Sequence, residues 1–145
     1  MKRMKLPRML GALVAVAACA ALLTPSTAQA KSPVYLTFDK SATGPGTWQG
    51  TVSGDIAGDL NTVLRDLRIT GPVWHVEFDW IVSAGSQSFI ARLNGILNTK
   101  TGAVVMNGRV IDGYLVGARV HEQGQLVDPN TSRFVGTIRI MPNSA

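Results

Sequence analysis

The stretch Val73-Trp74-His75-Val76-Glu77-Phe78-Asp79-Trp80 alternates large apolar side chains with mostly polar ones. Successive side chains of a β-strand point to opposite faces, so this pattern predicts a strand with one buried face. The turn-forming residues Thr70-Gly71-Pro72 and Ser83-Ala84-Gly85-Ser86 lie on either side of it and predict its ends. We expect the buried face to carry Trp74, Val76, Phe78 and Trp80.

The same alternation continues along most of the chain after residue 30. It predicts further strands at residues 48–60, 65–70, 88–93, 103–106, 114–122 and 133–141. Two stretches leave alternatives open. Residues 48–60 are either one long strand or a hairpin that turns near Gly54-Asp55, and a short helical turn fits Leu60 to Leu67 before the strand at 65–70. A polar loop is expected from Glu122 to Asn130.

About seven or eight short strands joined by tight turns predict an all-β fold. A chain of 145 residues has room for one domain, which we place at residues 31–145. Along residues 48–60 the apolar phase alternates bulky side chains with Gly50, Gly54 and Gly58, which suits the narrow interior and strong bending of a small barrel. The predicted fold is a single antiparallel up-and-down β-barrel, with a β-sandwich as the alternative.

The first thirty residues have the pattern of a secretory signal peptide. Four basic residues and no acidic one occupy positions 1–8, an apolar run follows from Met9 to Leu23, and Ala28-Gln29-Ala30 is a small-x-small cleavage site. We expect cleavage after Ala30 and a secreted protein. The apolar run is shorter than the roughly 18–20 residues of a membrane-spanning helix, which argues against a permanent span. Val16-Ala17-Ala18-Cys19 resembles a lipoprotein box, so a lipid anchor at Cys19 is the weaker alternative.

Charge and cysteine content exclude several classes of function. The net charge of +5 falls to +1 without the four basic residues of positions 1–8, and the remaining arginines are dispersed among acidic residues. This argues against nucleic-acid binding. The single cysteine lies in the leader, which excludes a thiol nucleophile after cleavage. Phosphate-binding loops, serine-hydrolase elbows and histidine metal motifs do not occur in the sequence, so we expect no cofactor.

Two resemblances bear on the fold. Gly46-Thr47-Trp48 resembles the Gly-x-Trp of calycin barrels, in which the tryptophan closes one barrel end and a late-strand arginine packs over it. That resemblance implies such a role for Arg133 or Arg139. The glycine-punctuated pattern from Phe89 to Ile138 is similar to bacterial proteins with an allene-oxide-cyclase-type barrel. It implies a barrel that steers a reactive apolar substrate, with no particular residue carried over.

His75, Glu77 and Asp79 are the one polar cluster that the pattern places together. They share one strand face at intervals of roughly 7 Å, so they are candidates for a polar site that binds a metal or supplies an acid and a base. That face lies opposite the apolar one, and a solvated outer surface is therefore the favoured interpretation, with no metal site assigned. His121 is expected on the surface or at a barrel rim.

The aromatic residues are the candidate ligand-binding residues. We expect them to be core residues, some of which line a pocket that Gly50, Gly54 and Gly58 make roomy. The candidates are Trp48, Trp74, Phe78, Trp80 and Phe89. The leading hypothesis is a secreted, non-catalytic barrel that binds a small apolar ligand at its mouth, with no catalytic residue assigned. One alternative is a cyclase or isomerase, which needs an ionisable residue inside the barrel. Another is an envelope or surface interaction protein with a solid core.

Overall fold

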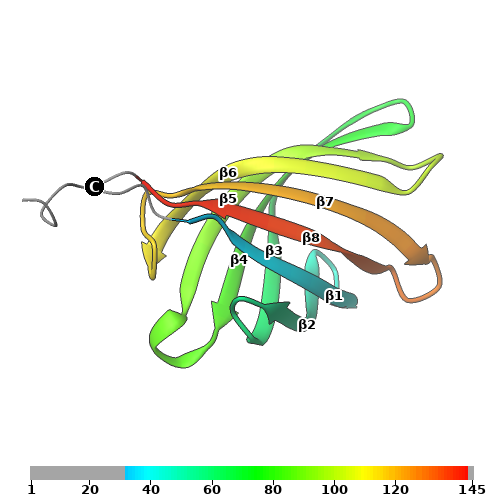
Figure 1. Cartoon of the computed structure of the whole chain (residues 1–145). Coiled ribbons are helices and arrows are strands. Elements are labelled where there is room, and N and C mark those ends of the chain that lie inside the picture. The colour runs from blue at the N-terminus through cyan, green and yellow to red at the C-terminus, as the bar shows by residue number, and fades with distance from the viewer. Residues whose placement is uncertain (1–31, 144–145) are drawn as a thin grey trace, which may run out of the picture. The chain divides into compact units, whose positions relative to one another are not determined.

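The computed structural model of the chain describes residues 32–143, and these form a closed barrel of eight antiparallel strands (Figure 1). Each strand pairs with the next along the chain, and the first pairs with the last. The strands are β1 (Val34–Gly44), β2 (Thr47–Gly54), β3 (Gly58–Thr70), β4 (Val73–Ser83), β5 (Phe89–Asn98), β6 (Ala103–Gly113), β7 (Arg119–Asp128) and β8 (Arg133–Met141). The predicted up-and-down barrel is confirmed. Closure pairs the first strand with the last, although residues 65–70 of β3 extend beyond β2 and pair with β4 alone.

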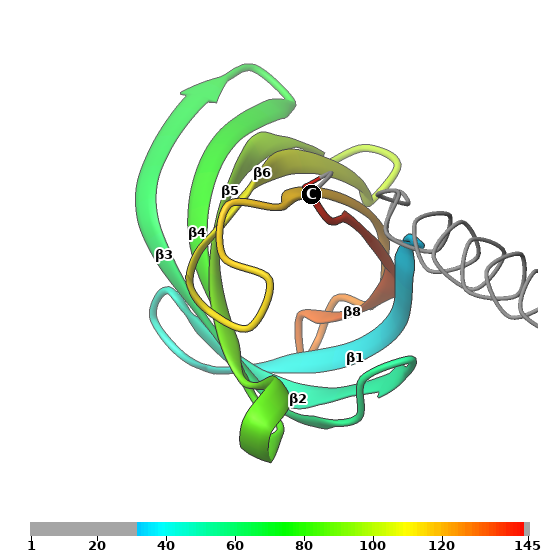
Figure 2. The ribbon, with the colours of Figure 1, turned by 60° about the vertical axis from the view of Figure 1, so that its left-hand side comes forward.

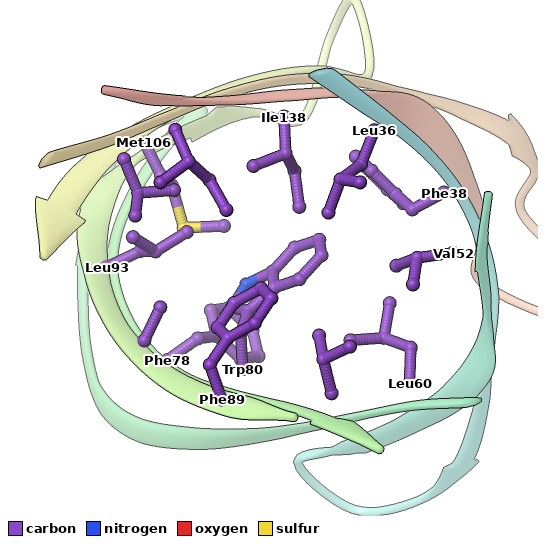
Figure 3. Packing of buried hydrophobic residues seen from close by; sticks show 14 of the residues in the cluster. Leu36, Phe38, Val52, Leu60, Phe78, Trp80, Phe89, Leu93, Met106 and Ile138 are labelled. Atoms are coloured by element: carbon purple, nitrogen blue, oxygen red, sulfur yellow. The ribbon is translucent and has the colours of Figure 1, made fainter. Parts of the chain in front are cut away.

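The barrel, whose ribbon is seen nearly end-on in Figure 2, holds one continuous apolar core, of which Figure 3 shows a close-up. Trp80 and Phe89 project from one wall toward the middle, and Leu36 and Ile138 approach from the opposite wall. The strand 73–80 is confirmed within β4, where Val76, Phe78 and Trp80 are buried and the residues between them are more exposed.

The inner-face glycines bring neighbouring strands close together. A Cβ added to Gly50 would overlap the carbonyl oxygen of Asp39, and one added to Gly136 would overlap that of Gln123. Backbone, rather than empty space, therefore lies beside these glycines. Gly54, the last residue of β2, has a φ of 111° and lies directly before the turn to β3. The prediction that Gly50, Gly54 and Gly58 make a pocket roomy is therefore wrong, because a Cβ on Gly58 would also overlap backbone, at Ser83.

Several predicted elements differ from the structure. Residues 48–60 form two strands with a turn at 55–57, so the hairpin alternative is correct, and residues 65–70 continue β3. The strand β1 was not among the predicted strands. The strand predicted at 114–122 is correct only for residues 119–122, which begin β7, because residues 114–118 form a turn. The loop predicted from Glu122 to Asn130 is wrong over most of its length, because β7 continues to Asp128. In β7 the polar residues Gln123 and Gln125 occupy the outer phase of the alternation, so polarity there does not indicate a loop.

A short 3-10 helix, η2 (Gly85–Gln87), connects β4 to β5. At this end of the barrel, Ile56, Phe89 and Ala118 are almost completely buried and close the core. Within residues 32–143, no helix has the length and apolar character that a membrane crossing requires. The predicted signal sequence, the predicted cleavage site after Ala30 and the alternative lipid anchor at Cys19 lie outside the described residues.

Candidate functional site

A cavity of about 70 Å³ lies inside the barrel, toward the end that carries the β1–β2, β3–β4, β5–β6 and β7–β8 turns. We call this end the mouth. All but two of the residues around the cavity are apolar, and the two exceptions are Lys40 and Glu122. The apolar residues that line it are Phe38, Trp48, Leu64, Leu67, Trp74, Val76, Phe78, Leu97, Val104, Met106 and Phe134.

The inner face becomes progressively more exposed toward the mouth. Along β4 and β3, Val76 is 7% exposed, its register partner Leu67 is 39% exposed, and Ile69 near the β3–β4 turn is 57% exposed. The cavity wall therefore continues into an apolar rim at the mouth. An apolar molecule entering there meets no charged side chain of the inner face before Lys40 and Glu122.

Lys40 points into the barrel because it shares the inward phase of β1 with Leu36 and Phe38, and it is only 5% exposed. Its Nζ atom lies 4.4 Å from the centroid of the Trp80 ring and 5.1 Å from that of Phe78. The rings of Phe38 and Trp48 are each 5.7 Å away. The faces of aromatic rings attract cations, so these rings partly replace the water that a buried ammonium group loses. The nearest hydroxyl oxygen, Oγ1 of Thr62, is 3.5 Å away.

Glu122 points inward from β7 and is 1% exposed. Its register partners are Met106 on β6 and Ile138 on β8, both buried apolar residues. Within residues 32–143 its Oε1 atom has no hydrogen-bond partner. A buried polar atom without a partner is costly, and one at a cavity wall is available to a ligand.

Burial shifts the pKa values of both groups toward 7. Loss of solvation raises the pKa of Glu122 to about 7, opposed by the positive charge of Lys40. The same loss lowers the pKa of Lys40 to about 8, opposed by the charge of Glu122. Among the described residues, the ion pairs with nitrogen–oxygen distances up to 4.0 Å are formed by Asp39, Glu77 and Asp79 with arginines. Lys40 and Glu122 therefore face one cavity without direct contact.

The predicted ligand-binding aromatic residues divide between the cavity and the closed core. Trp48, Trp74 and Phe78 line the cavity. Trp80 is fully buried and does not line the cavity, and its ring centroid lies 4.9 Å from that of Phe38 and 4.4 Å from Nζ of Lys40. Phe89 begins β5 next to η2, at the closed end, and does not line the cavity.

The cluster His75, Glu77 and Asp79 lies on the outer face of β4. Asp79 accepts hydrogen bonds from Arg92 at 2.8 and 3.2 Å and from Arg65 at 3.1 Å, and the Arg92 bonds contribute most to lowering its pKa. No group of three or more histidine, cysteine or acidic side chains within residues 32–143 is placed to hold a metal ion. The cluster is a solvated surface with arginine partners rather than part of the cavity.

The arginines implied by the calycin resemblance also lie outside the barrel. Arg133 donates hydrogen bonds of 2.9 and 2.6 Å to Asp39, while Trp48 donates its indole N–H to the carbonyl oxygen of Ser132 at 3.0 Å. Arg139 is exposed on β8. The cation beside Trp48 within the described residues is Lys40.

Arginines that are dispersed in the sequence converge on the outer face of β6–β8. Arg109, Arg119 and Arg139 line a surface groove together with His121. Arg109 and Arg119 are direct register partners, and facing like charges weaken a strand pair. This groove is a positively charged surface patch that the sequence pattern did not predict.

Lys40 and Glu122 were missed by the sequence analysis, although a signal for each exists. Leu36-x-Phe38-x-Lys40 and Val120-x-Glu122 put a charged residue in the apolar phase of an alternating stretch. The first stretch lies in β1, which was not predicted, and Glu122 stood where the strand predicted at 114–122 met a predicted loop. Comparisons with protein-family models, with curated proteins and with solved structures found no match to this chain.

Proposed function

We propose that the protein binds a small, predominantly apolar molecule that carries one polar group. The apolar part enters the barrel through the mouth, and the polar group meets Lys40 and Glu122. The observation that carries this proposal is the unpaired Oε1 atom of Glu122 at the wall of an otherwise apolar cavity. Ligand sites combine an apolar lining with a few convergent polar groups in this way.

The size of the cavity limits the ligand. A buried apolar cavity of about 150 Å³ accommodates benzene, so about 70 Å³ holds only part of such a molecule. A narrow chain fits better than a fused ring system, because the remainder of a chain extends along the exposed apolar rim at Leu67 and Ile69. Short aliphatic alcohols, aldehydes and acyclic terpenoids satisfy these requirements.

Tryptophan fluorescence tests the proposal, because two of the three tryptophans line the cavity and the third lies beneath Lys40. Titration with hexan-1-ol and with acyclic terpenoid alcohols is expected to change the emission saturably, and native mass spectrometry is expected to show one bound molecule. No saturable change with any of these compounds refutes the proposal.

A matched pair of variants locates the site. Val76→Phe adds ring atoms at the cavity wall, whereas Val105→Phe makes the same change at an exposed position on β6. Binding is expected to weaken at least about tenfold in Val76→Phe, because the new ring occupies the space of the ligand. It is expected to stay unchanged in Val105→Phe. Equal affinities in the two variants place the site elsewhere.

A second candidate is an isomerase or cyclase that acts on a reactive apolar substrate. The observation that favours it is an acid and an amine on one apolar cavity, with pKa values near 7 and 8 that suit proton transfer at neutral pH. Incubation with an unsaturated aliphatic epoxide tests it. Catalysis is expected to give a cyclic isomer of unchanged mass at a rate that Glu122→Gln lowers by about 100-fold or more. A Glu122→Gln variant that reacts as fast as the wild type refutes this role.

A further inference from the structure

We propose that Lys40 captures small apolar aldehydes covalently, by forming a Schiff base inside the cavity. This inference rests on the proposed function, since an aldehyde must first occupy the same cavity. It goes further by assigning a chemical reaction to one atom, Nζ of Lys40, and a class of ligand, the short-chain aliphatic aldehydes.

The surroundings of Lys40 favour attack on a carbonyl group. Its amine lies at the wall of an apolar cavity, and within the described residues no carboxylate oxygen lies within 4.0 Å of it. Its one hydrogen bond, to Thr62, is long at 3.5 Å. The amine is therefore held in place chiefly by aromatic rings, which leave its lone pair free once the proton has gone. Apolar walls also exclude the water that hydrolyses imines.

Burial increases the supply of unprotonated amine. With a pKa of about 8 instead of 10.5, Lys40 holds about 200-fold more free amine at pH 7.5 than an ordinary lysine does. The only other lysine among residues 32–143 is Lys100, which is exposed in the β5–β6 turn. The chain thus carries its own reference amine for comparison.

The reaction needs no oxidant or reductant. The Nζ lone pair forms a bond to the carbonyl carbon, and the carbonyl π electrons move to the oxygen, which takes a proton from the Glu122 carboxylic acid. The Glu122 carboxylate then accepts a proton from the nitrogen, giving a neutral carbinolamine. Glu122, again a carboxylic acid, protonates the hydroxyl group, and water leaves while the nitrogen lone pair completes the C=N bond. One amine, one aldehyde and the Glu122 proton give one protonated imine, one water and the Glu122 carboxylate.

The rings that surround the amine also suit the product. A protonated imine carries its positive charge on the same nitrogen as the ammonium group did. That charge stays over the Trp80 and Phe78 rings, whose centroids lie 4.4 and 5.1 Å from Nζ. The alkyl chain of the captured aldehyde points along the apolar lining toward the mouth, where Leu67 is partly exposed.

The test traps the imine by reduction. The protein is incubated at pH 7.5 with hexanal and cyanoborohydride, and peptide mapping then measures the alkylation of each amine, a mass gain equal to hexanal less one oxygen atom. Lys40 is expected to react at least about 50-fold faster than Lys100. Lys40→Met is expected to lose this fast reaction, and Lys100→Met to keep it. In urea, where the cavity is lost, the two lysines are expected to react at equal rates.

Equal labelling of Lys40 and Lys100 in the folded wild type overturns the inference, and this result does not depend on whether Lys40→Met folds. Hexan-1-ol separates this failure from that of the proposed function, because it has the same chain but cannot form an imine. Saturable binding of hexan-1-ol without fast labelling of Lys40 by hexanal leaves the binding site in place and refutes the Schiff base. Absence of both refutes both proposals.

Discussion

The buried pair Lys40 and Glu122 gives the barrel a pH dependence of stability that is opposite to the usual one. Most proteins gain stability as the pH rises from acid toward neutral, because ion pairs and hydrogen bonds in the folded state lower the pKa values of their carboxyl groups. The pKa of Glu122 is instead raised from 4.5 to about 7 by burial. Its folded form therefore binds a proton more tightly than the unfolded chain does. Its contribution is fully present below pH 4.5 and is lost as the pH rises toward 7.

The size of the effect follows from the same values. The difference between 4.5 and about 7 corresponds to about 3 kcal/mol in the free energy of unfolding. Lys40 acts in the opposite direction at alkaline pH, because burial lowers its pKa from 10.5 to about 8. The unfolded chain holds that proton more tightly between these values, so stability rises by about 3 kcal/mol from pH 8 to 10.5. The pair thus places a minimum of stability between pH 7 and 8.

Urea unfolding at a series of pH values, followed by tryptophan fluorescence, measures this dependence. The comparison uses wild type and Glu122→Gln, which keeps the side-chain size and removes the titration. Titrating groups other than Lys40, whose pKa the charge of Glu122 raises, are common to both proteins and cancel. The unfolding free energy of the variant minus that of the wild type is expected to increase by about 3 kcal/mol from pH 4.5 to 7. A difference that stays constant over this range refutes the assignment of a buried titrating carboxyl at Glu122.

Two further predictions concern the barrel wall. Gly50→Ala is expected to lower the free energy of unfolding by about 3 kcal/mol, because the new Cβ overlaps the Asp39 carbonyl oxygen. In the control Gly44→Ala the new Cβ meets only Oγ1 of Thr47, at 3.3 Å, and the free energy of unfolding is expected to change by less than about 0.5 kcal/mol. Chemical denaturation measures both variants, and equal effects contradict the close strand approach at Gly50. Asp79→Asn removes the pairs with Arg92 and Arg65, which are partly exposed, so a loss of at most about 1 kcal/mol is expected, smaller still in high salt. A larger, salt-independent loss shows that Asp79 has a structural role beyond these pairs.

The fold could be predicted because its main signal is local. Alternation in residues such as Trp74 to Trp80 needs no knowledge of the partner strand, and the structure confirms both β4 and the barrel. Turn positions were harder, since glycine serves two purposes in this chain. Gly54 has a positive φ and lies at a turn, while Gly50 lies within a strand beside a neighbouring backbone. Both have the same appearance in the sequence.

The site could be predicted only in part, since it depends on which strands meet. Trp48, Trp74 and Phe78 were identified because apolar alternation places them inward. Lys40 and Glu122 lie on β1 and β7, which are not paired with each other, and closure of the barrel brings their side chains to one cavity. A charged residue in an apolar phase marks each of them. Across β8 the register sets Glu122 level with Leu36, four residues before Lys40, so the shared cavity cannot be read from either strand alone.

The energetic cost of burying Lys40 and Glu122 indicates that the pair has a function. A buried lysine and a buried glutamate without direct contact cost folding free energy, and apolar residues of similar size commonly pack at such positions at no loss of stability. The rest of the described core is nearly all apolar, with Thr62 as the other buried polar residue. The two charged groups lie at the wall of a cavity inside the barrel, beneath an exposed apolar rim. A requirement for stability alone favours neither the charges nor the cavity, whereas a ligand with one polar group and an apolar chain accounts for both.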